Sequence, residues 1–465
     1  MKTRWLVWLV LAVFVSTVAA TPALAANGDR IVRTKSSDGL GVITSACKLL
    51  GCTVLGSLDT VPGQTQPSSL FLVRGLVDTV VTLLLSLLGI ASIEVDRPVS
   101  LEQSAPSDLV QASVAVLDQL GKRTPMTYYG TVAWEGYLDQ PAGDIVGVRY
   151  THCSLGATGA GIVAVIDSGV DPNHPALKPV LTGGYDFLRN VAGGSEMADL
   201  GQASVAVLDG VYQVNQASVA VLDQASVAVL DDPGHAAFGH GTMVSGIIHL
   251  VAPGAKIMPL KAFQASGQGY TSDILHAIYY ATQKGAKVLN MSFSRPTSSP
   301  EMKRAIDNAT SKGLIAVAAA GNDASASLVY PAALGNVMGV ASTEDDDTRS
   351  PFSNYGSNLV WVAAPGAGII TTYPWGSFAA GWGTSFSAPF VSGAAALVVG
   401  LKSSATYSQA SSAIAHAKTL SSDLGYGRLD LDQAIPAARS LWYSTNTSPV
   451  PDSCLAQGVD WSAAP

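Results

Sequence analysis

Charge is scarce in this chain of 465 residues, and the charges that are present are mostly acidic. Charged residues make up 13% of the sequence, and the formal net charge is −8. Proteins that bind nucleic acids carry clustered Lys and Arg that neutralise phosphates, so this composition argues against such a partner. An apolar share of 48% together with 46 glycines indicates a compact protein with a large core.

Cysteine is also rare, with only four in the chain. Their spacing is not that of a zinc site. Three disulfide pairings are possible, and we prefer Cys47 with Cys52 and Cys153 with Cys454 because each pair then stays inside one candidate domain. Free thiols remain the alternative.

One apolar run beyond the N-terminus could be mistaken for a membrane helix but lacks the length. The run over 77–95 has an uninterrupted apolar core of about a dozen residues, short of the roughly 20 that a spanning helix needs. At the N-terminus, Lys2 and Arg4 precede a short apolar run that ends before the small-residue motif at 23–25. This predicts a signal peptide over 1–25 and a secreted, extracellular or periplasmic protein with no membrane association after its removal. An uncleaved anchor is the alternative.

Residues 26–105 form a first candidate unit, which mixes strand and helix patterns. The patterns predict strands over 29–35, 68–75 and 90–101, and helices over 40–51 and 77–89. This order is typical of a small α+β, ferredoxin-like (split βαβ) domain. A polar stretch over 106–124 follows, contains the first copy of the octet QASVAVLD, and is interpreted as a linker.

The sequence pattern changes at residue 125. From there to residue 440, short apolar strand patterns alternate with helical patterns. We expect strands over 161–167, 255–263, 286–293, 314–322, 337–342 and 359–366, and helices over 271–285, 300–313 and 385–402. Such alternation predicts an α/β fold with a doubly wound, mostly parallel sheet flanked by helices. Its functional crevice should lie at the carboxyl ends of the strands. The tail over 441–465 has no clear periodicity.

Three residues suggest catalysis when they are taken together. Asp167 ends an apolar strand, His240 begins a helical stretch, and Ser385 opens another. Separately, they are typical of a turn Asp, a structural His and an N-cap Ser. In the order Asp, His, Ser they form a candidate triad, in which the Asp orients the His and the His takes the proton of the Ser.

A strand that ends in Gly321 and Asn322 adds a fourth candidate group. The Asn322 amide and the backbone N–H of Ser385 could both donate to a tetrahedral oxyanion. An ordinary Asn-Asp turn is the alternative.

With these motifs in order, the chain resembles a subtilisin-family serine protease (a subtilase) over roughly 125–440. The matching blocks are VIDSGVDPNHP, GHGTMVSGII, NMSF, AAAGN, YPA and GTSFSAPFVSGAAAL. The resemblance implies a subtilisin-like fold, and 26–105 is similar to the family's propeptide, a chaperone and inhibitor. It further implies a secreted serine endopeptidase, made as an autoprocessed precursor, that works through an acyl-enzyme intermediate. The alternative is a non-catalytic or self-inhibited subtilase-like binding or scaffold protein.

The resemblance also implies a substrate cleft. Its walls would be one strand at Gly267, Gln268 and Gly269 and another at Ser292, Phe293 and Ser294, with an extended peptide added between them. The pocket for the residue before the scissile bond would be lined by Ala319, Ala320 and Gly321, which favours apolar residues there.

No cofactor is expected for the chemistry. Structural calcium is possible by resemblance, but no metal ligand can be assigned, and the acidic stretch over 343–350 is better interpreted as a solvated turn. The expected partners are protein or peptide substrates and the chain's own propeptide, with the protein itself a monomer.

The octet QASVAVLD occurs four times, at 111–118, 202–209, 216–223 and 224–231. The last three copies lie in an insertion at about 195–232 between Asp167 and His240. Their alternating pattern predicts strands, and so a β-ribbon or partly disordered flap over the cleft. A DNA-level repeat tolerated in surface loops is the alternative, and we prefer it as the origin of the octets.

Overall fold

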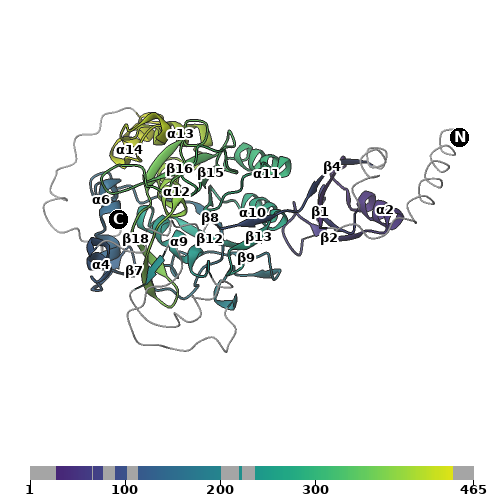
Figure 1. Cartoon of the computed structure of the whole chain (residues 1–465), viewed down its shortest axis with the longest axis horizontal. Coiled ribbons are helices and arrows are strands. Elements are labelled where there is room, and N and C mark those ends of the chain that lie inside the picture. Colours follow the sequence, from purple (N-terminus) through teal and green to yellow (C-terminus); the bar gives the residue numbers. More distant parts are fainter. Residues whose placement is uncertain are drawn as a thin grey trace, which may run out of the picture.

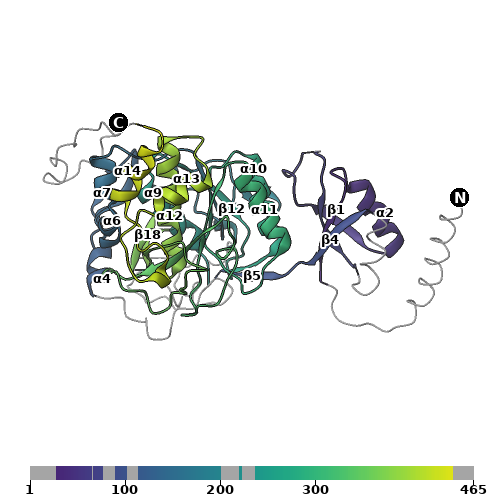
Figure 2. The same cartoon turned by 90° about the horizontal axis from the view of Figure 1, so that it is seen from above.

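A computed structural model describes residues 28–64, 66–76, 89–101, 114–199, 219–221 and 236–443. The predicted signal peptide, nearly all of the predicted helix 77–89, most of the octet-bearing insertion and all but three residues of the tail lie outside these ranges. The described chain forms a small N-terminal unit and a larger α/β body, which lie side by side in Figures 1 and 2.

The small unit is an antiparallel sheet with a helix. Its elements are β1 (Arg30–Thr34), α2 (Leu40–Leu50), β2 (Thr53–Ser57), β3 (Leu70–Arg74) and β4 (Ile90–Val95). The sheet order is β2-β3-β1-β4, which is the strand order of a split βαβ domain. The sequence patterns missed β2, a strand whose residues are mostly exposed.

A disulfide joins the end of α2 to the residue before β2. Cys47 and Cys52 are bonded with their Cα atoms 4.4 Å apart, which confirms the first of the two preferred pairs. Cys153 is also disulfide-bonded, and its predicted partner Cys454 lies outside the described residues.

The body is built on an eight-stranded sheet of order β10-β9-β12-β8-β14-β15-β16-β17. Its strands are β8 (Ile162–Asp167), β9 (Tyr185–Asp186), β10 (Val191–Ala192), β12 (Lys256–Lys261), β14 (Val288–Met291), β15 (Ile315–Ala319), β16 (Met338–Thr343) and β17 (Val362–Pro365). All neighbouring pairs are parallel except β10–β9. The predicted doubly wound parallel sheet is confirmed.

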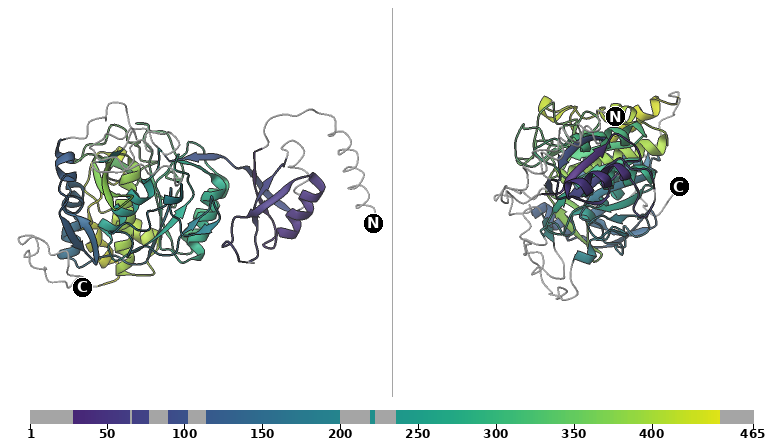
Figure 3. Two further views of the ribbon diagram at one scale, coloured as in Figure 1. Left: turned by 90° about the horizontal axis from the view of Figure 1, so that it is seen from below. Right: turned by 90° about the vertical axis from the view of Figure 1, so that its right-hand side faces the viewer.

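Helices cover both faces of this sheet. On one face lie α9 (His240–Val251) and α12 (Thr384–Leu401), and on the other α10 (Thr271–Gln283) and α11 (Pro300–Ser311). The N-terminal unit stands beside α10 and α11 (Figures 2 and 3). Because side chains alternate along each strand, neighbouring residues of β8 such as Val163 and Ala164 enter different core clusters.

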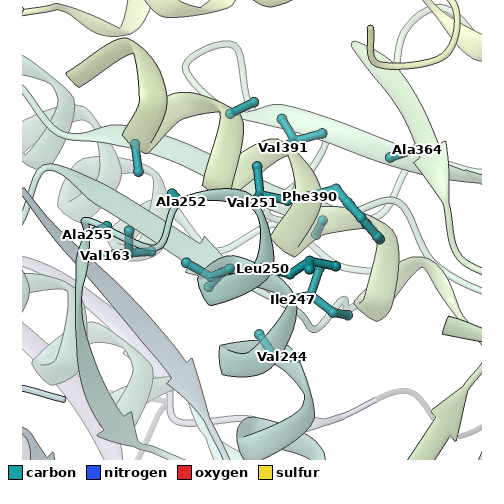
Figure 4. Close-up of a cluster of buried hydrophobic side chains, with 14 of the residues drawn as sticks. Val163, Val244, Ile247, Leu250, Val251, Ala252, Ala255, Ala364, Phe390 and Val391 are labelled. Atoms are coloured by element: carbon teal, nitrogen blue, oxygen red, sulfur yellow. The ribbon is translucent and has the colours of Figure 1, made fainter. Parts of the chain in front are cut away.

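The central helix α12 is apolar around its whole circumference. In the described chain it alone has the length and hydropathy of a membrane span, yet 89% of that stretch is buried inside the protein. Phe390 and Val391 of α12 pack with Ile247 and Val251 of α9 (Figure 4). The absence of a side chain at Gly393 permits this approach, because a Cβ there would lie 2.5 Å from Cβ of Val251.

Further elements surround this core. They are α5 (Glu135–Leu138), α6 (Pro141–Ile145), α7 (Val148–Cys153), α13 (Tyr407–Ile414) and α14 (Leu431–Ser440), with the 3-10 turns η1 (Met197–Asp199) and η3 (Ser422–Leu424). Two hairpins, β6 (Pro125–Tyr128) with β7 (Thr131–Trp134) and β18 (Ile369–Tyr373) with β19 (Ser377–Gly381), were not expected from the sequence.

The octet adopts two different structures. In the first copy, Val114 to Asp118 belong to the helix α4 (Val114–Leu120), within the stretch interpreted as a linker. α4 contacts α5 and β19, and Leu120 at its end is fully buried, so the described part of the predicted linker 106–124 is packed against the body. In the third copy, β11 (Val219–Val221) is a strand that pairs antiparallel with β19. The rest of the predicted ribbon lies outside the described residues.

Candidate active site

The predicted site residues meet at the carboxyl ends of neighbouring strands. Asp167 is the last residue of β8, Ser292 follows β14, and Asn322 follows β15 by three residues. Since β8, β14 and β15 are consecutive and parallel in the sheet, these strand ends lie at one edge. The helices α9 and α12 begin at the same edge and bring His240 and Ser385 to it.

Asp167 and His240 form a buried hydrogen-bonded pair. Nδ1 of His240 lies 2.7 Å from Oδ1 of Asp167, which also accepts the backbone N–H of Ser168 at 2.7 Å. Asp167 is fully buried and His240 is 8% exposed. Burial lowers the pKa of His240, but the charge and hydrogen bond of Asp167 and the charge of Glu196 outweigh it and raise this pKa above its ordinary value.

Ser385 lies in the first turn of α12, after Gly383, whose φ of 144° favours glycine. Its Oγ donates to the carbonyl oxygen of Ser292 at 3.0 Å, so it is not turned toward His240 in this structure. In the described part of the chain, Nε2 of His240 has no hydrogen-bond partner. The His240 ring lies 5.6 Å from the ring of Phe386, the neighbour of Ser385 in the sequence.

A proline within α12 leaves one helix carbonyl oxygen free to bind Ser292, which follows β14. Pro389 has no N–H to donate to the carbonyl oxygen four residues earlier, which is that of Ser385. The hydroxyl of Ser292 donates to this carbonyl at 3.0 Å instead. Ser292 therefore contacts Ser385 through both its hydroxyl and its carbonyl oxygen.

Asn322 is oriented by the start of α12. Its Oδ1 accepts the backbone N–H of Thr384 at 2.8 Å and the Thr384 hydroxyl at 3.0 Å. Because the amide oxygen faces Thr384, the Nδ2 group points the other way and stays near the surface, with Asn322 7% exposed. Nδ2 and the N–H of Ser385, an unpaired first-turn donor, can serve one oxyanion.

A segment of the N-terminal unit lies between the two predicted cleft walls. β5 (Pro98–Ser100) pairs antiparallel with β13 (Gln268–Tyr270), with Gln268 opposite Ser100 and Gly269 opposite Val99. Ser100 also bridges Ser294 on the other wall. The backbone N–H of Leu101 donates to the carbonyl oxygen of Gly267 at 2.8 Å. The chain thus places its own strand where an added peptide strand is expected.

Side chains of this segment alternate between burial and exposure. Val99 and Leu101 are each 2% exposed, whereas Ser100 between them is exposed. Val99 and Leu101 belong to the same buried cluster as Phe263 and Phe293. The apolar side chains of this segment are therefore buried against the body at every second residue.

Polar contacts join the same N-terminal unit to the ends of α10 and α11. Asp96 accepts the backbone N–H of Ser272 at 2.9 Å and its hydroxyl at 2.7 Å, and so caps α10 from outside. At α11, Arg33 forms a 2.8 Å ion pair with Glu301, which is buried. The unit is held to the body by these contacts as well as by β5.

The residues predicted to line the specificity pocket are small and apolar. Ala319 and Ala320 are buried, and Gly321 donates its N–H to the Thr384 hydroxyl at 3.1 Å. Arg295, which follows the wall residue Ser294, is 5% exposed and donates to the Thr271 hydroxyl at 2.9 Å. The guanidinium group of Arg295 therefore lies at the first residue of α10.

The described residues contain no group of three or more His, Cys, Asp or Glu side chains that could hold a metal ion. In the acidic turn over 343–350, Asp347 bonds Lys418 and Arg428, while Asp346 accepts from Thr348. These two carboxylates are thus bound by side chains of the protein.

One buried acid at this site was not anticipated from its sequence pattern. Glu196, at the start of the octet-bearing insertion, is fully buried beside Ser168 and the first turn of α9. A single Glu in a polar loop gives no periodic signal, and its partners lie 28 and 43 residues away in the sequence.

Similarity to known proteins shows that the chain is a serine peptidase. The sequence profile of the subtilase family (Peptidase S8) matches residues 159–433, and the chain belongs to that family, whose members are serine endopeptidases.

Several characterised proteins are similar to the chain. Thermitase of Thermoactinomyces vulgaris is 33% identical over 253 residues, which is 52% of this chain and 76% of thermitase. Subtilisin Savinase of Lederbergia lenta is 40% identical over 169 residues, covering 34% of this chain and 62% of that protein. The thermophilic serine proteinase of Bacillus sp. (strain AK1) is 34% identical over 236 residues, 51% of either chain.

Proposed function

We propose that the chain is the self-inhibited precursor of an extracellular serine endopeptidase with Asp167, His240 and Ser385 as its triad. The observation that carries this proposal is the 2.7 Å contact between His240 and Asp167, at the strand edge where Ser385 begins its helix. The apolar N-terminus supports export, and the resemblance to secreted subtilisins agrees with it.

In the proposed mechanism, Ser385 attacks the carbonyl carbon of the substrate while His240 takes its proton at Nε2. Asp167 holds the other ring nitrogen and stabilises the imidazolium that forms. The oxyanion accepts from Asn322 Nδ2 and from the N–H of Ser385. His240 then protonates the leaving amine, and water hydrolyses the acyl-enzyme by the reverse sequence of proton transfers.

Ser385 must first turn from Ser292 toward His240. Catalytic hydrogen bonds are often long or absent before substrate binds, and they form in the productive complex. We infer that a bound peptide drives this rotation because its backbone competes for the carbonyl oxygen of Ser292, the present acceptor.

The position of β5 supports cleavage of the chain by its own site. Ser100 stands opposite Ser294 in antiparallel register, and we propose that a substrate strand keeps this register as far as Ser292, two residues further along. The proposed processing bond is therefore Glu102–Gln103. The N-terminal unit would then remain bound as an inhibitor through β5 and Asp96.

This bond follows an acidic residue, whereas the pocket of Ala319, Ala320 and Gly321 favours apolar residues in other substrates. An intramolecular substrate has a high effective concentration, which compensates for a poor residue in the pocket.

Expression of the full chain and its Ser385→Ala variant tests the proposal. The unaltered chain should mature to a protein that begins at Gln103 and hydrolyses casein, while the variant accumulates uncut and inactive. The Ser440→Ala variant is the matched control and should leave maturation unchanged, since Ser440 is exposed at the end of α14 and its hydroxyl bonds the carbonyl oxygen of Ala437 in its own helix. Casein hydrolysis by Ser385→Ala would disprove the triad, and a different N-terminus would disprove the register alone.

The alternative, a permanently self-inhibited or scaffold protein, is favoured by one observation, the occupied cleft. A fluorophosphonate probe distinguishes the two: it should label Ser385 in the matured protein. Failure to label after the N-terminal unit is removed would favour the scaffold.

A further inference from the structure

The helix that carries His240 begins without a cap of its own. Its N-cap residue is Gly239, with φ of 89° and no side chain to accept the free N–H groups of the first turn. A larger residue does not fit there, because a Cβ on Gly239 would lie 2.4 Å from Cε2 of Tyr373. The free donors of this turn therefore need acceptors from elsewhere in the chain.

Glu196, in another loop, accepts the N–H of the N-cap residue and binds two hydroxyl groups beside the turn, one of which accepts the first-turn N–H of Gly241. One carboxylate oxygen accepts the N–H of Gly239 at 2.8 Å and the hydroxyl of Ser168 at 3.0 Å, and the other accepts the hydroxyl of Thr242. Glu196 is completely buried, so water does not compete for these three donors.

The two hydroxyl groups are committed to Glu196 by their other contacts. Oγ of Ser168 accepts the N–H of Gly241 at 3.0 Å, and Oγ1 of Thr242 accepts the N–H of Asp171 at 2.8 Å. Each hydroxyl is thus an acceptor on one side and gives its proton to the carboxylate on the other. A charged carboxylate satisfies this set of donors, and a neutral side chain of the same size does not.

We propose that Glu196 is a positioning residue that fixes Asp167 and His240 against each other and keeps a negative charge behind them. Ser168 directly follows Asp167, and Gly239 directly precedes His240, so one carboxylate holds both partners of the 2.7 Å contact. This inference rests on the proposed function, since it assigns Glu196 to the same reaction.

If Glu196 acts as proposed, its charge should affect the pH at which His240 titrates. Burial raises the pKa of Glu196 to about 7, against its hydrogen bonds and the charge of Lys261. The ionised form of Glu196 raises the pKa of His240 in turn. The titratable or charged groups around the two are Asp167, Lys261, Asp199 and Tyr373.

The first test measures His240 directly in the full-length Ser385→Ala chain, by NMR titration of its ring, so no hydrolysis is needed. Replacing Glu196 with Gln should move the midpoint of the His240 titration to lower pH by about one pH unit, as expected for removal of a nearby buried charge. Glu344→Gln, a half-buried carboxyl in the 343–350 turn, is the control and should leave the midpoint in place.

The second test is kinetic and uses the matured enzyme. Glu196→Gln should lower kcat by about tenfold to a hundredfold with little change in KM, because the His240–Asp167 geometry is lost and the peptide contacts are kept. The acidic limb of the kcat profile should move in the same direction as the NMR midpoint. Glu196→Asp, which keeps the charge, should restore the pH midpoint even where kcat is only partly recovered.

Thr242→Val removes one donor and leaves the carboxylate, and it replaces Glu196→Gln if that variant does not fold. It should lower kcat less than Glu196→Gln and move the His240 midpoint upward or not at all, since the charge remains. An unmoved His240 midpoint in folded Glu196→Gln would show that the charge of Glu196 does not act on His240, and it would overturn the proposal. If Ser385→Ala still hydrolyses casein, the triad fails while the titration of His240 still decides the role of Glu196.

Discussion

A buried histidine far from the site should limit the stability of the fold in acid. His249 of α9 is 1% exposed, and its Nε2 lies 3.2 Å from the hydroxyl oxygen of Thr131. That hydroxyl donates to the carbonyl oxygen of Tyr128 at 2.7 Å, so it must accept from His249. The neutral ring therefore carries its proton on Nε2, and Nδ1 is buried with no hydrogen-bond partner in the described chain.

Protonation of Nδ1 would place a charge in this apolar site. Burial, followed by the charges of His152, His174 and Lys256, lowers the pKa of His249 to about 3, against the ordinary value of 6.5. His249 is thus protonated near pH 6.5 in the unfolded chain but only near pH 3 in the folded chain. Stability is complete above pH 6.5 and falls as the pH drops, and linkage gives a loss of about 3 kcal/mol by pH 4.

Urea unfolding of the full-length Ser385→Ala chain at pH 7 and pH 4, followed by circular dichroism, measures this loss. The His249→Gln variant keeps a donor for Thr131 but does not titrate. Its free energy of unfolding should fall by about 3 kcal/mol less between the two pH values than that of the parent. Any defect of the variant at pH 7 cancels in this difference. Equal losses in both proteins would refute the argument that His249 is buried in its neutral form.

Three further predictions concern the site and its inhibitor. Asn322→Ala should lower kcat by about 100- to 1,000-fold with little change in KM, and a change in KM alone would exclude Asn322 from the oxyanion site. Asp96→Ala leaves the first turn of α10 uncapped, so inhibition should weaken by about 1 kcal/mol, near fivefold, and the lag before activity should shorten; an unchanged lag would contradict this. Leu101→Asp puts a carboxylate at a buried position, and gel analysis should show uncut precursor, whereas normal maturation would mean that β5 does not set the processing register.

The strand-to-helix plan of the body could be predicted from the sequence because its signals are local. Strands such as β8 and β15 are short unbroken apolar runs that end in Asp167 or lead to Asn322, and each is followed by a helical pattern. The motifs also placed His240 and Ser385 at helix starts. These features depend on neighbouring residues, and so a single sequence reveals them.

What could not be predicted depends on distant partners. The β18–β19 hairpin is buried on nearly every residue, so it has no alternating pattern to mark it as strands. Glu196 gains its role only when Ser168 and Gly239 fold around it. The direction of the Ser385 hydroxyl, which donates to Ser292, depends on a side-chain rotamer that the sequence does not determine.

The two structures of the octet have a consequence for what its letters encode. The letters Val-Ala-Val are helical in α4 at Val114–Val116 and extended in β11 at Val219–Val221. Both described copies adjoin β19, the strand that leads to Ser385. The conformation of these two copies is therefore set by the surface on which each one packs, and not by the octet alone.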